Sequence, residues 1–170
     1  MDVDAKLPVG LFEGKTILVT GGTGSFGGYF IDYLLDKKFK EIRVFSRDEL
    51  KQDNMRLRLQ NSKVKFYIGD VRDRSSVDDA MSGVDYVFHA AALKQVPACE
   101  FFPKQAMQTN VIGSQNVIES AISRGVSKVV SLSTDKAVYP VNALGITKAL
   151  MEKVIQSTSR NLSEGQTVLT

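Results

Sequence analysis

The stretch from Thr20 to Gly27 has the composition of a phosphate-binding loop. It follows an apolar, strand-like segment and opens a helix-like one, the context in which a glycine pattern indicates a dinucleotide site. We expect Gly21 to form the tight turn, Gly24 to admit a pyrophosphate, and Gly27 to let the helix pack closely. A glycine-rich turn without a ligand is the alternative. The expected phosphate-site residues are Gly21, Thr23, Gly24, Ser25, Phe26 and Gly27.

The stretch after the second expected strand indicates which dinucleotide the chain prefers. Folds that bind NAD place an acid about 20 residues past the glycines, where it accepts hydrogen bonds from the ribose 2′-hydroxyl. This chain has Ser46 and Arg47 there, and a hydroxyl with a guanidinium suits a 2′-phosphate. Lys51 could add a further positive charge. We therefore expect NADP, with NAD as the alternative because Asp48 lies in the same stretch.

The third and fourth expected strands end in residues that could meet the rest of the dinucleotide. Open α/β sheets bind ligands at the carboxyl ends of their strands. Asp70 could lie near the adenine amino group, and the alanines that follow the fourth strand leave room for the cofactor backbone. The residues expected to line this part of the site are Asp70, Val71, Ala90, Ala91 and Ala92.

Four other residues with reactive or charged side chains are expected to be structural or solvated rather than part of the site. His89 comes at a strand end and is expected to be packed rather than catalytic. Cys99 has no histidine nearby in the sequence, which does not favour a nucleophile. Arg56 and Arg58 are expected to be solvated helix residues instead of ligands.

These residues need a scaffold, and the sequence predicts one in which strands and helices alternate. The strand-like segments are short and continuously apolar, as is typical of parallel strands covered on both faces. The alternation predicts an α/β fold of three layers, a Rossmann doubly wound parallel sheet. We expect Ser75 to cap the third helix in a Ser-x-x-Asp pattern with Asp78. The expected strands are 16–20, 42–45, 64–68, 85–88 and 128–132, and the expected helices are 26–35, 48–59, 75–81, 106–122 and 143–155.

The length of the chain allows one domain. At 170 residues it has room for a single Rossmann unit but not for a second full domain. We expect an N-terminal extension over residues 1–14 and the NAD(P)-binding Rossmann domain over residues 15–170. Residues 165–170 resemble a turn and the start of a sixth strand. The sheet is therefore expected to be truncated near that strand, with a C-terminal substrate domain absent from the chain.

Charge and hydropathy exclude several classes of protein. The formal net charge is +3 with acids and bases interspersed, which does not favour a nucleic-acid partner. No apolar run approaches the roughly 18 residues of a spanning helix, and the N-terminus is unlike a signal peptide, so we expect no membrane partner. A cytoplasmic location is the default and agrees with a single cysteine. We expect no metal site.

Four motifs together resemble the extended short-chain dehydrogenase/reductase superfamily. They are the glycine loop, the alanine turn after His89, Asn110 in the long expected helix, and the run Ser133-Thr134-Asp135-Lys136. Longer runs narrow the resemblance to a bacterial polysaccharide-biosynthesis branch, the UDP-N-acetylglucosamine 4,6-dehydratases that also invert C5. This implies a UDP-sugar substrate, and homo-oligomers, dimers or hexamers, for the full-length protein. The longer runs are residues 45–52, 89–97 and 132–137.

One position departs from the superfamily pattern. Leu144 stands where most members carry the tyrosine of Tyr-x-x-x-Lys, whereas Lys148 is kept. An apolar residue there is similar to the subgroup that makes capsule or O-antigen precursors of N-acetyl-L-fucosamine, in which methionine takes that place. The resemblance therefore implies a soluble enzyme of this subgroup rather than a membrane-fused relative.

The resemblance implies a division of labour between Asp135 and Lys136. In such a reaction NADP⁺ takes the C4 hydride, a base removes the C5 proton, an acid helps the C6 hydroxyl to leave, and hydride returns to C6. Asp135 is the expected acid, with its pKa raised by burial, and Lys136 is the expected base, with its pKa lowered by desolvation. Both can reach one sugar only if their segment is a turn, because neighbours on a strand point to opposite faces.

The remaining site residues follow from the same resemblance. Lys148 is expected to bind the nicotinamide ribose, and Asn110 belongs to the cofactor site. The group that deprotonates the C4 hydroxyl stays open among Lys136, Lys148 acting through water, and Thr134 acting as a relay. The expected substrate contacts are Lys94 and Ser133.

Two other functions stay open. A simple NADP-dependent reductase would need the tyrosine that Leu144 replaces, and a non-catalytic NADP-binding module would have no use for Asp135 and Lys136. For that pair, the alternative is an exposed charged pair in a loop. We expect the 170-residue chain alone to bind cofactor weakly and to turn over little.

Overall fold

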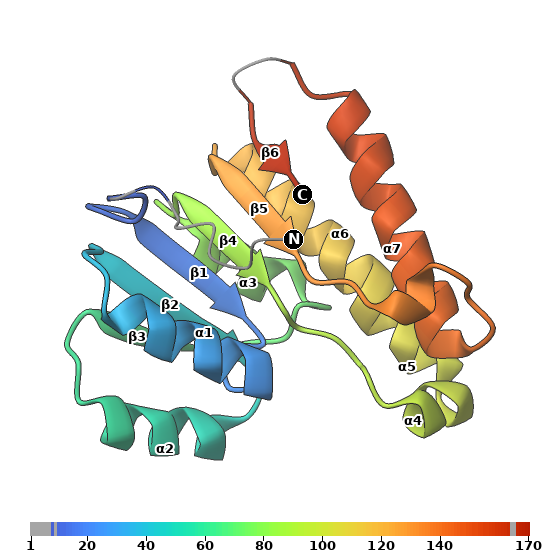
Figure 1. The fold of residues 1–170 in the computed structure, drawn as a ribbon, viewed down its shortest axis with the longest axis horizontal. Coiled ribbons are helices and arrows are strands. Elements are labelled where there is room, and N and C mark those ends of the chain that lie inside the picture. The colour runs from blue at the N-terminus through green and yellow to red at the C-terminus, as the bar shows by residue number, and fades with distance from the viewer. Residues whose placement is uncertain (1–7, 9, 164–165) are drawn as a thin grey trace.

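The computed structural model describes residues 8, 10–163 and 166–170. They form a six-stranded sheet in the order β3-β2-β1-β4-β5-β6, and each neighbouring pair is parallel (Figure 1). The predicted Rossmann fold is thereby confirmed. The strand order changes direction between β1 and β4, the kind of place where open α/β sheets bind ligands. The strands are β1 (Thr16–Thr20), β2 (Glu41–Ser46), β3 (Val64–Ile68), β4 (Tyr86–His89), β5 (Lys128–Ser131) and β6 (Val168–Leu169).

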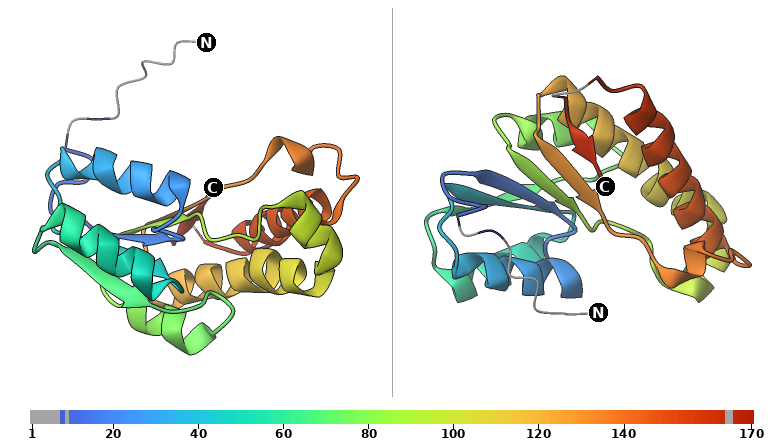
Figure 2. Two further views of the ribbon diagram at one scale, coloured as in Figure 1. Left: turned by 90° about the horizontal axis from the view of Figure 1, so that it is seen from below. Right: turned by 45° about the horizontal axis from the view of Figure 1, so that its top comes forward.

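Helices lie on both sides of the sheet. The first two helices cover one face, and α3 and α6 cover the other, which makes the three layers (Figures 1 and 2). A long helix, α7, packs against α6 through Ile118, Met151 and Ile155. The helices are α1 (Ser25–Leu35), α2 (Glu49–Leu59), α3 (Arg74–Met81), α4 (Val96–Phe101), α5 (Pro103–Met107), α6 (Gly113–Ser123) and α7 (Ala143–Arg160), with a π-helical turn η1 (Gln108–Ile112) and a 3₁₀ turn η2 (Asp135–Ala137).

Two apolar cores hold the layers together, because successive strand residues point to opposite faces. Ile17 and Val19 of β1 pack on one side with Ile31 of α1. Leu18, between them, packs on the other side with Val117 of α6. All five of these side chains are fully buried. The continuous apolar run of β1 thus follows from its two covered faces.

The stretch before β5 is helical, as the sequence indicates, but its helix is not uniform. The helix predicted over residues 106–122 is confirmed as one continuous run formed by α5, η1 and α6, and a further short helix, α4, precedes it. Pro97 and Pro103 each lie in the first turn of a helix, where the missing N–H is not needed. Pro97 therefore lies at the start of α4, and Pro103 starts the long helical run. The π-helical turn that follows carries Asn110 at its centre.

The cap of α3 also differs from the prediction. Asp73 precedes the helix, and its Oδ1 accepts hydrogen bonds from the N–H and the hydroxyl of Ser75, at 3.0 and 2.9 Å. Asp78 instead pairs with Arg74 at 2.9 Å. The predicted cap by Ser75 is wrong because the carboxylate two residues earlier takes both of its donors.

The chain ends are consistent with the predicted sheet where they are described. β6 pairs with β5 at the position expected for a sixth strand, whereas Gly165 of the expected turn lies outside the described residues. Near the other end, Phe12 is buried against β4, with its ring centroid 6.3 Å from that of Tyr86. Within the described ranges, no helix combines the length and the apolar character needed to cross a membrane.

Candidate active site

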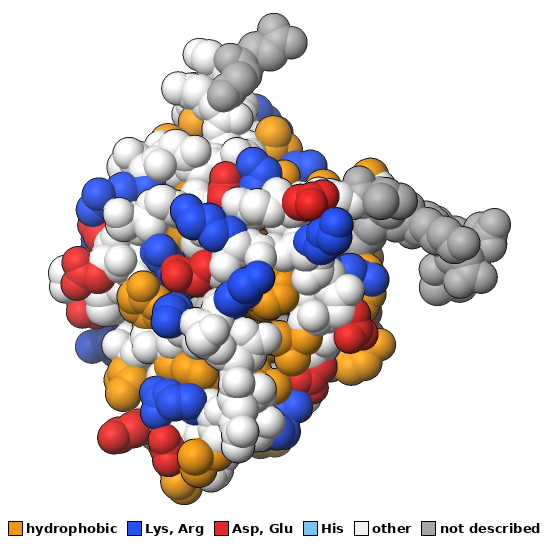
Figure 3. Space-filling view, turned by 90° about the vertical axis from the view of Figure 1, so that its left-hand side faces the viewer, with side chains coloured by type: hydrophobic (Ala, Val, Ile, Leu, Met, Phe, Trp, Pro, Cys, Tyr) orange, Lys and Arg blue, Asp and Glu red, His pale blue; other side chains and the backbone are white. Residues whose placement is uncertain are grey.

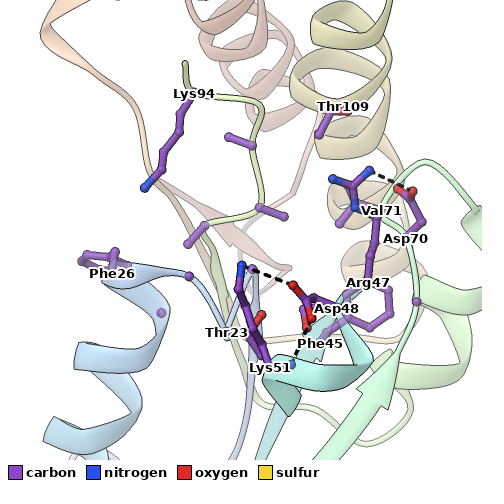
Figure 4. Close-up of a pocket in the computed structure, with 18 of the residues that line it drawn as sticks. Thr23, Phe26, Phe45, Arg47, Asp48, Lys51, Asp70, Val71, Lys94 and Thr109 are labelled. Carbon is purple, nitrogen blue, oxygen red and sulfur yellow. Dashed lines mark hydrogen bonds and ion pairs between the residues drawn. The ribbon is translucent and has the colours of Figure 1, made fainter. Parts of the chain in front are cut away.

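A cleft opens at the carboxyl ends of β1 to β4 and is about 300 Å³ in volume (Figure 4). We call it the strand-end cleft. Of the residues predicted for the cofactor site, it brings together all but Asn110 and Lys148. It also includes Lys94, a predicted substrate contact. Its lining residues are Gly21, Thr23, Gly24, Ser25, Phe26, Gly27, Phe45, Ser46, Arg47, Asp48, Lys51, Gly69, Asp70, Val71, Ala90, Ala91, Ala92, Lys94 and Thr109.

The glycine loop has the close approaches that the sequence predicts. Gly21 has φ of +66°, and a Cβ there would lie 2.7 Å from the backbone nitrogen of Ala91. A Cβ on Gly27 would lie 2.5 Å from the carbonyl oxygen of Gly21, so α1 can start here only with glycine. Gly24 is the N-cap of α1, and among the described residues no side chain caps that helix. An uncapped first turn facing a cleft suits an anionic phosphate.

The charged side chains at the ends of β2 and β3 are paired with one another. Asp70 accepts two hydrogen bonds from the Arg72 guanidinium, at 2.9 and 2.6 Å, and lies 3.5 Å from the Arg47 guanidinium. Burial alone would raise the pKa of Asp70, but the hydrogen bonds and charge of Arg72, with a smaller effect from Arg47, hold it below its ordinary value. Asp70 is therefore an ionised acceptor that also steadies Arg47 beside the cleft (Figure 4).

Asp48, the acid that keeps NAD as an alternative, has a local structural role. It is the N-cap of α2, and its side chain accepts a hydrogen bond from the N–H of Lys51 at 3.0 Å. Its second oxygen lies 3.2 Å from the Lys51 ammonium. The backbone hydrogen bond from Lys51 lowers the pKa of Asp48. Ser46, which is 9% exposed, lines the cleft beside this pair.

Asn110, a predicted cofactor residue, is not among the residues that line the strand-end cleft. Its Oδ1 accepts from the N–H of Leu93 at 2.8 Å, and its Nδ2 donates to the carbonyl oxygen of Leu93 and to Thr147 Oγ1, at 3.0 and 3.1 Å. Both hydrogens of the Asn110 Nδ2 and one lone pair of its Oδ1 are thereby used. Thr109, the preceding residue, lines the cleft instead, because successive residues of a helical turn point in different directions.

Lys148 lies on α7 outside the cleft lining and is 6% exposed. Its Nζ donates to the carbonyl oxygen of Leu132 at 2.6 Å and lies 3.6 Å from Met151 Sδ. Burial lowers the pKa of this lysine to about 8. Leu144, one turn earlier, is buried with Cys99 and faces the protein interior. The position of the missing phenol is thus part of an apolar cluster.

Asp135 and Lys136 lie together on the turn η2, as their proposed roles require. Lys136 Nζ is 3.3 Å from Asp135 Oδ1, and Thr134 Oγ1 donates to the same oxygen at 2.9 Å. The expected burial of Asp135, with a raised pKa, is not found in the described structure: its side chain is 86% exposed, and the hydrogen bonds from Thr134 and Lys136 lower its pKa. In the described structure they form an exposed charged pair.

The two residues expected to contact the substrate, Lys94 and Ser133, lie in different hollows of the structure. Lys94 extends into the strand-end cleft from the segment after β4 (Figure 4). Ser133 instead hydrogen-bonds to Glu152 of α7, in a different hollow beside β6. Ser133 therefore lies outside the strand-end cleft, and Asp135 and Lys136 are not among its lining residues either.

The remaining polar candidates have the structural roles expected of them. His89 is 1% exposed, and Cys99 is fully buried with its Sγ 3.5 Å from the carbonyl oxygen of Leu93. Arg56 and Arg58 pair with acids on the surface, and the side of the molecule at the left of Figure 1 carries acids and bases intermixed (Figure 3).

A parallel sheet in this order, with a glycine loop and a cleft at its switch point, is the architecture of the extended short-chain dehydrogenase/reductase superfamily. The chain belongs to the family described as polysaccharide biosynthesis protein, whose family model matches residues 17–170. The predicted superfamily is thus confirmed.

Two sets of relatives illustrate the family. A protein of Rickettsia prowazekii named UDP-glucose 4-epimerase is 59% identical over 163 residues, covering 94% of this chain and 48% of that protein. A protein of the same name from Rickettsia canadensis is 60% identical with the same coverage. The chain therefore spans about half the length of these relatives.

Among solved structures, Pen from Bacillus thuringiensis has a TM-score of 0.89 and 39% identity, over 92% of this chain and 49% of that one. The dTDP-glucose 4,6-dehydratase DesIV from Streptomyces venezuelae, solved with NAD and TYD bound, has a TM-score of 0.79 and 26% identity, over 85% and 52%.

Proposed function

We propose that the protein is an NADP-dependent UDP-N-acetylglucosamine 4,6-dehydratase that inverts C5, in capsule or O-antigen biosynthesis. One observation carries the proposal: Asp135 and Lys136 lie side by side on a turn at the carboxyl end of the sheet, close to the helix of Lys148. An acid and a base in contact suit a substrate that must lose a proton and a hydroxyl from adjacent carbons.

The proposal of NADP rests on the charges around the strand-end cleft. Ser46, Arg47 and Lys51 line it at the end of β2, while Asp48 is used as a helix cap. The 2′-phosphate of NADP would meet a hydroxyl and two cations there. When bound, the dinucleotide supplies reversible hydride transfer. The glycine loop and the first turn of α1 would hold its pyrophosphate.

The chain's own residues then divide the proton transfers. Lys136 would remove the C5 proton, and Asp135 would protonate the leaving C6 oxygen. Asp135 is ionised in the exposed turn, so its acid role requires that bound sugar bury it and raise its pKa. Lys148 would bind the ribose. Its pKa of about 8 is close to neutral pH, where a general base is most effective.

A second candidate, epimerisation at C4 of a UDP-sugar, is favoured by the names of the rickettsial relatives. Epimerisation removes a hydride from C4 and the proton from its hydroxyl, and returns both, with the hydride added to the other face of the same carbon. It breaks no bond at C5 or C6, so it gives the pair of Asp135 and Lys136 no elimination to catalyse. The two candidates therefore differ in what happens at C5.

The test uses this chain, and any longer product of its gene, with NADP⁺ in deuterated water and either UDP-N-acetylglucosamine or UDP-glucose. We expect a 4-keto-6-deoxy product with deuterium at C5 from the N-acetylated sugar. Asp135→Asn and Lys136→Gln should abolish it, whereas the exposed control Lys153→Gln should not. A C4 epimer without deuterium at C5 would establish the epimerase, and bound NADP⁺ with no reaction would favour the non-catalytic module.

A further inference from the structure

The single histidine of the chain has no role in the proposed chemistry, yet it is the most buried titratable group beside the cleft. His89 ends β4 and is 1% exposed. Its Nδ1 lies 2.7 Å from Thr20 Oγ1, and its Nε2 lies 2.8 Å from Ser114 Oγ. The imidazole therefore joins the end of β1 to helix α6.

The partners of these two hydroxyls determine where the imidazole proton lies. Ser114 Oγ donates its one hydrogen to the carbonyl oxygen of Asn110 at 2.7 Å, so it can only accept from His89. Nε2 must then carry the proton, and Nδ1 must accept from the hydroxyl of Thr20. Thr20 Oγ1 in turn accepts from the N–H of Ala91 at 3.3 Å. Each group therefore donates to the next one, in a chain of hydrogen bonds that begins at the N–H of Ala91 and ends at the carbonyl oxygen of Asn110.

The Thr20 end of this chain of hydrogen bonds lies at the wall of the strand-end cleft. Ala91 lines the cleft, and the N–H of Ala90 donates to the carbonyl oxygen of Thr20 at 3.1 Å. Gly21, next to Thr20, approaches Ala90 and Ala91 so closely that no Cβ fits between them. The glycine loop and the alanine turn are therefore held against each other at the point where the imidazole contacts Thr20.

We propose that His89 is a positioning residue, a neutral imidazole with its proton on Nε2 that fixes the glycine loop against the alanine turn and thereby sets dinucleotide affinity. It transfers no proton. The role requires that the chain bind a dinucleotide in the strand-end cleft, and it is independent of the sugar and of the reaction.

The surroundings of His89 keep it neutral. Burial first, and then the positive charge of Lys148, lower the pKa of His89 to about 3. The groups in hydrogen-bond contact with the ring, Thr20 and Ser114, are uncharged hydroxyls. A proton added to Nδ1 would displace the hydrogen that Thr20 donates. Across the neutral range, the imidazole therefore has one protonation state.

Because the chain has one histidine, ¹⁵N labelling of histidine gives two ring-nitrogen resonances without any assignment. We expect Nε2 to show a directly bonded proton and Nδ1 to show the shift of an unprotonated nitrogen, with both unchanged from about pH 5 to 9. A proton on Nδ1, averaged resonances, or titration within this range would overturn the proposal. This measurement needs no substitution and no cofactor.

Two amide variants test the two hydrogen bonds of the imidazole one at a time. The side-chain oxygen of His89→Asn falls near the Nδ1 position and can still accept from Thr20, whereas the amide of His89→Gln falls near Nε2 and can still donate to Ser114. We expect the Asn variant to keep its dissociation constant for NADP⁺ within about threefold and the Gln variant to weaken it about tenfold, since Thr20 loses its acceptor.

The same variants report on the alanine turn without cofactor. Hydrogen exchange at the Ala91 amide should be about tenfold faster in His89→Gln than in His89→Asn. A role in folding alone would lower the thermal midpoint of both variants and leave their NADP⁺ affinities and Ala91 exchange rates equal. That equality would overturn the proposal, whether or not the dehydratase assay succeeds.

Discussion

Two of the cations that line the strand-end cleft, Arg47 and Lys51, already have acidic partners before any ligand enters. Asp70 keeps its paired hydrogen bonds to Arg72 if Arg47 moves away, because the Arg47 contact is the longer one, at 3.5 Å. The Arg47 side chain is 57% exposed, and an exposed ion pair contributes only about 0 to 1 kcal/mol. Arg47 can therefore turn toward a 2′-phosphate at little cost.

Arg47→Ser is accordingly expected to lower NADP⁺ affinity by on the order of tenfold while leaving NAD⁺ affinity within about twofold. Calorimetric titration with each dinucleotide measures both values. Arg58→Ser is the matched control, because Arg58 pairs with Asp32 outside the cleft. An equal loss for NAD⁺ and NADP⁺ would show that Arg47 does not contact the 2′-phosphate.

Lys148 makes the stability of the chain depend on pH. Its pKa is about 8 in the folded chain, against 10.5 ordinarily, so the folded state holds this proton less tightly than the unfolded state does. Below about pH 8 the lysine is charged in both states and its burial has its full cost. As pH rises from about 8 to 10.5, the folded chain releases the proton first and the cost falls.

We therefore expect the free energy of unfolding of the parent chain to rise relative to Lys148→Met between about pH 7 and 10.5. The change should be on the order of 3 kcal/mol, from a shift of about 2.5 pKa units. Urea unfolding of both proteins at several pH values measures it, with the exposed Lys153→Met as the control. A difference that stays constant with pH would contradict the assignment.

At the scale of elements, the start of α7 holds the turn that carries Asp135 and Lys136. Asn142 caps α7 by accepting from the N–H of Gly145 at 2.8 Å. A Cβ on Gly145 would collide with the carbonyl oxygen of Lys136. Glycine at this position thus lets the turn η2 lie directly on α7.

Two glycine-to-alanine substitutions should have opposite effects for this reason. Gly145→Ala is expected to lower the free energy of unfolding by about 1 to 3 kcal/mol through overpacking. Gly28→Ala, within α1, should raise it by about 0.5 to 1 kcal/mol, because its Cβ would lie at an ordinary 3.7 Å from Met55 Cε. Urea unfolding compares them, and stabilisation by both would mean that η2 moves away freely.

At the scale of the whole molecule, the strand-end cleft is built from four strands that belong to both halves of the sheet. A dinucleotide that binds there contacts the folded chain only, so it stabilises the entire fold by mass action. At about 100 times its dissociation constant, NADP⁺ should raise the free energy of unfolding by about 2.7 kcal/mol. For a domain of this size, the thermal midpoint should rise by roughly 5 to 10 °C.

Thermal unfolding with equal concentrations of NADP⁺ and NAD⁺ checks this prediction. We expect the larger rise with NADP⁺, and we expect Arg47→Ser to remove the difference. No rise with either dinucleotide would show that the described chain does not bind a nicotinamide dinucleotide by itself.

The sequence by itself determined the features that depend on local pattern. Alternating apolar segments predicted the parallel sheet, and the glycines between Thr20 and Gly27 placed the phosphate loop, because only glycine fits the close backbone contacts found there. Ser46, Arg47 and the alanine turn could be predicted as cleft residues because the ends of parallel strands meet at one edge.

Tertiary structure alone decided what each polar side chain contacts. Asn110 and Thr109 are neighbours in sequence, but packing turns one toward Leu93 and the other into the cleft. Asp135 is exposed and has a lowered pKa, whereas a buried carboxyl with a raised pKa was expected, since nothing in the described structure covers its turn. The position proposed for the His89 ring proton depends on hydroxyls 69 and 25 residues away in the chain. Such contacts depend on how distant elements pack, which no local spacing of residues specifies.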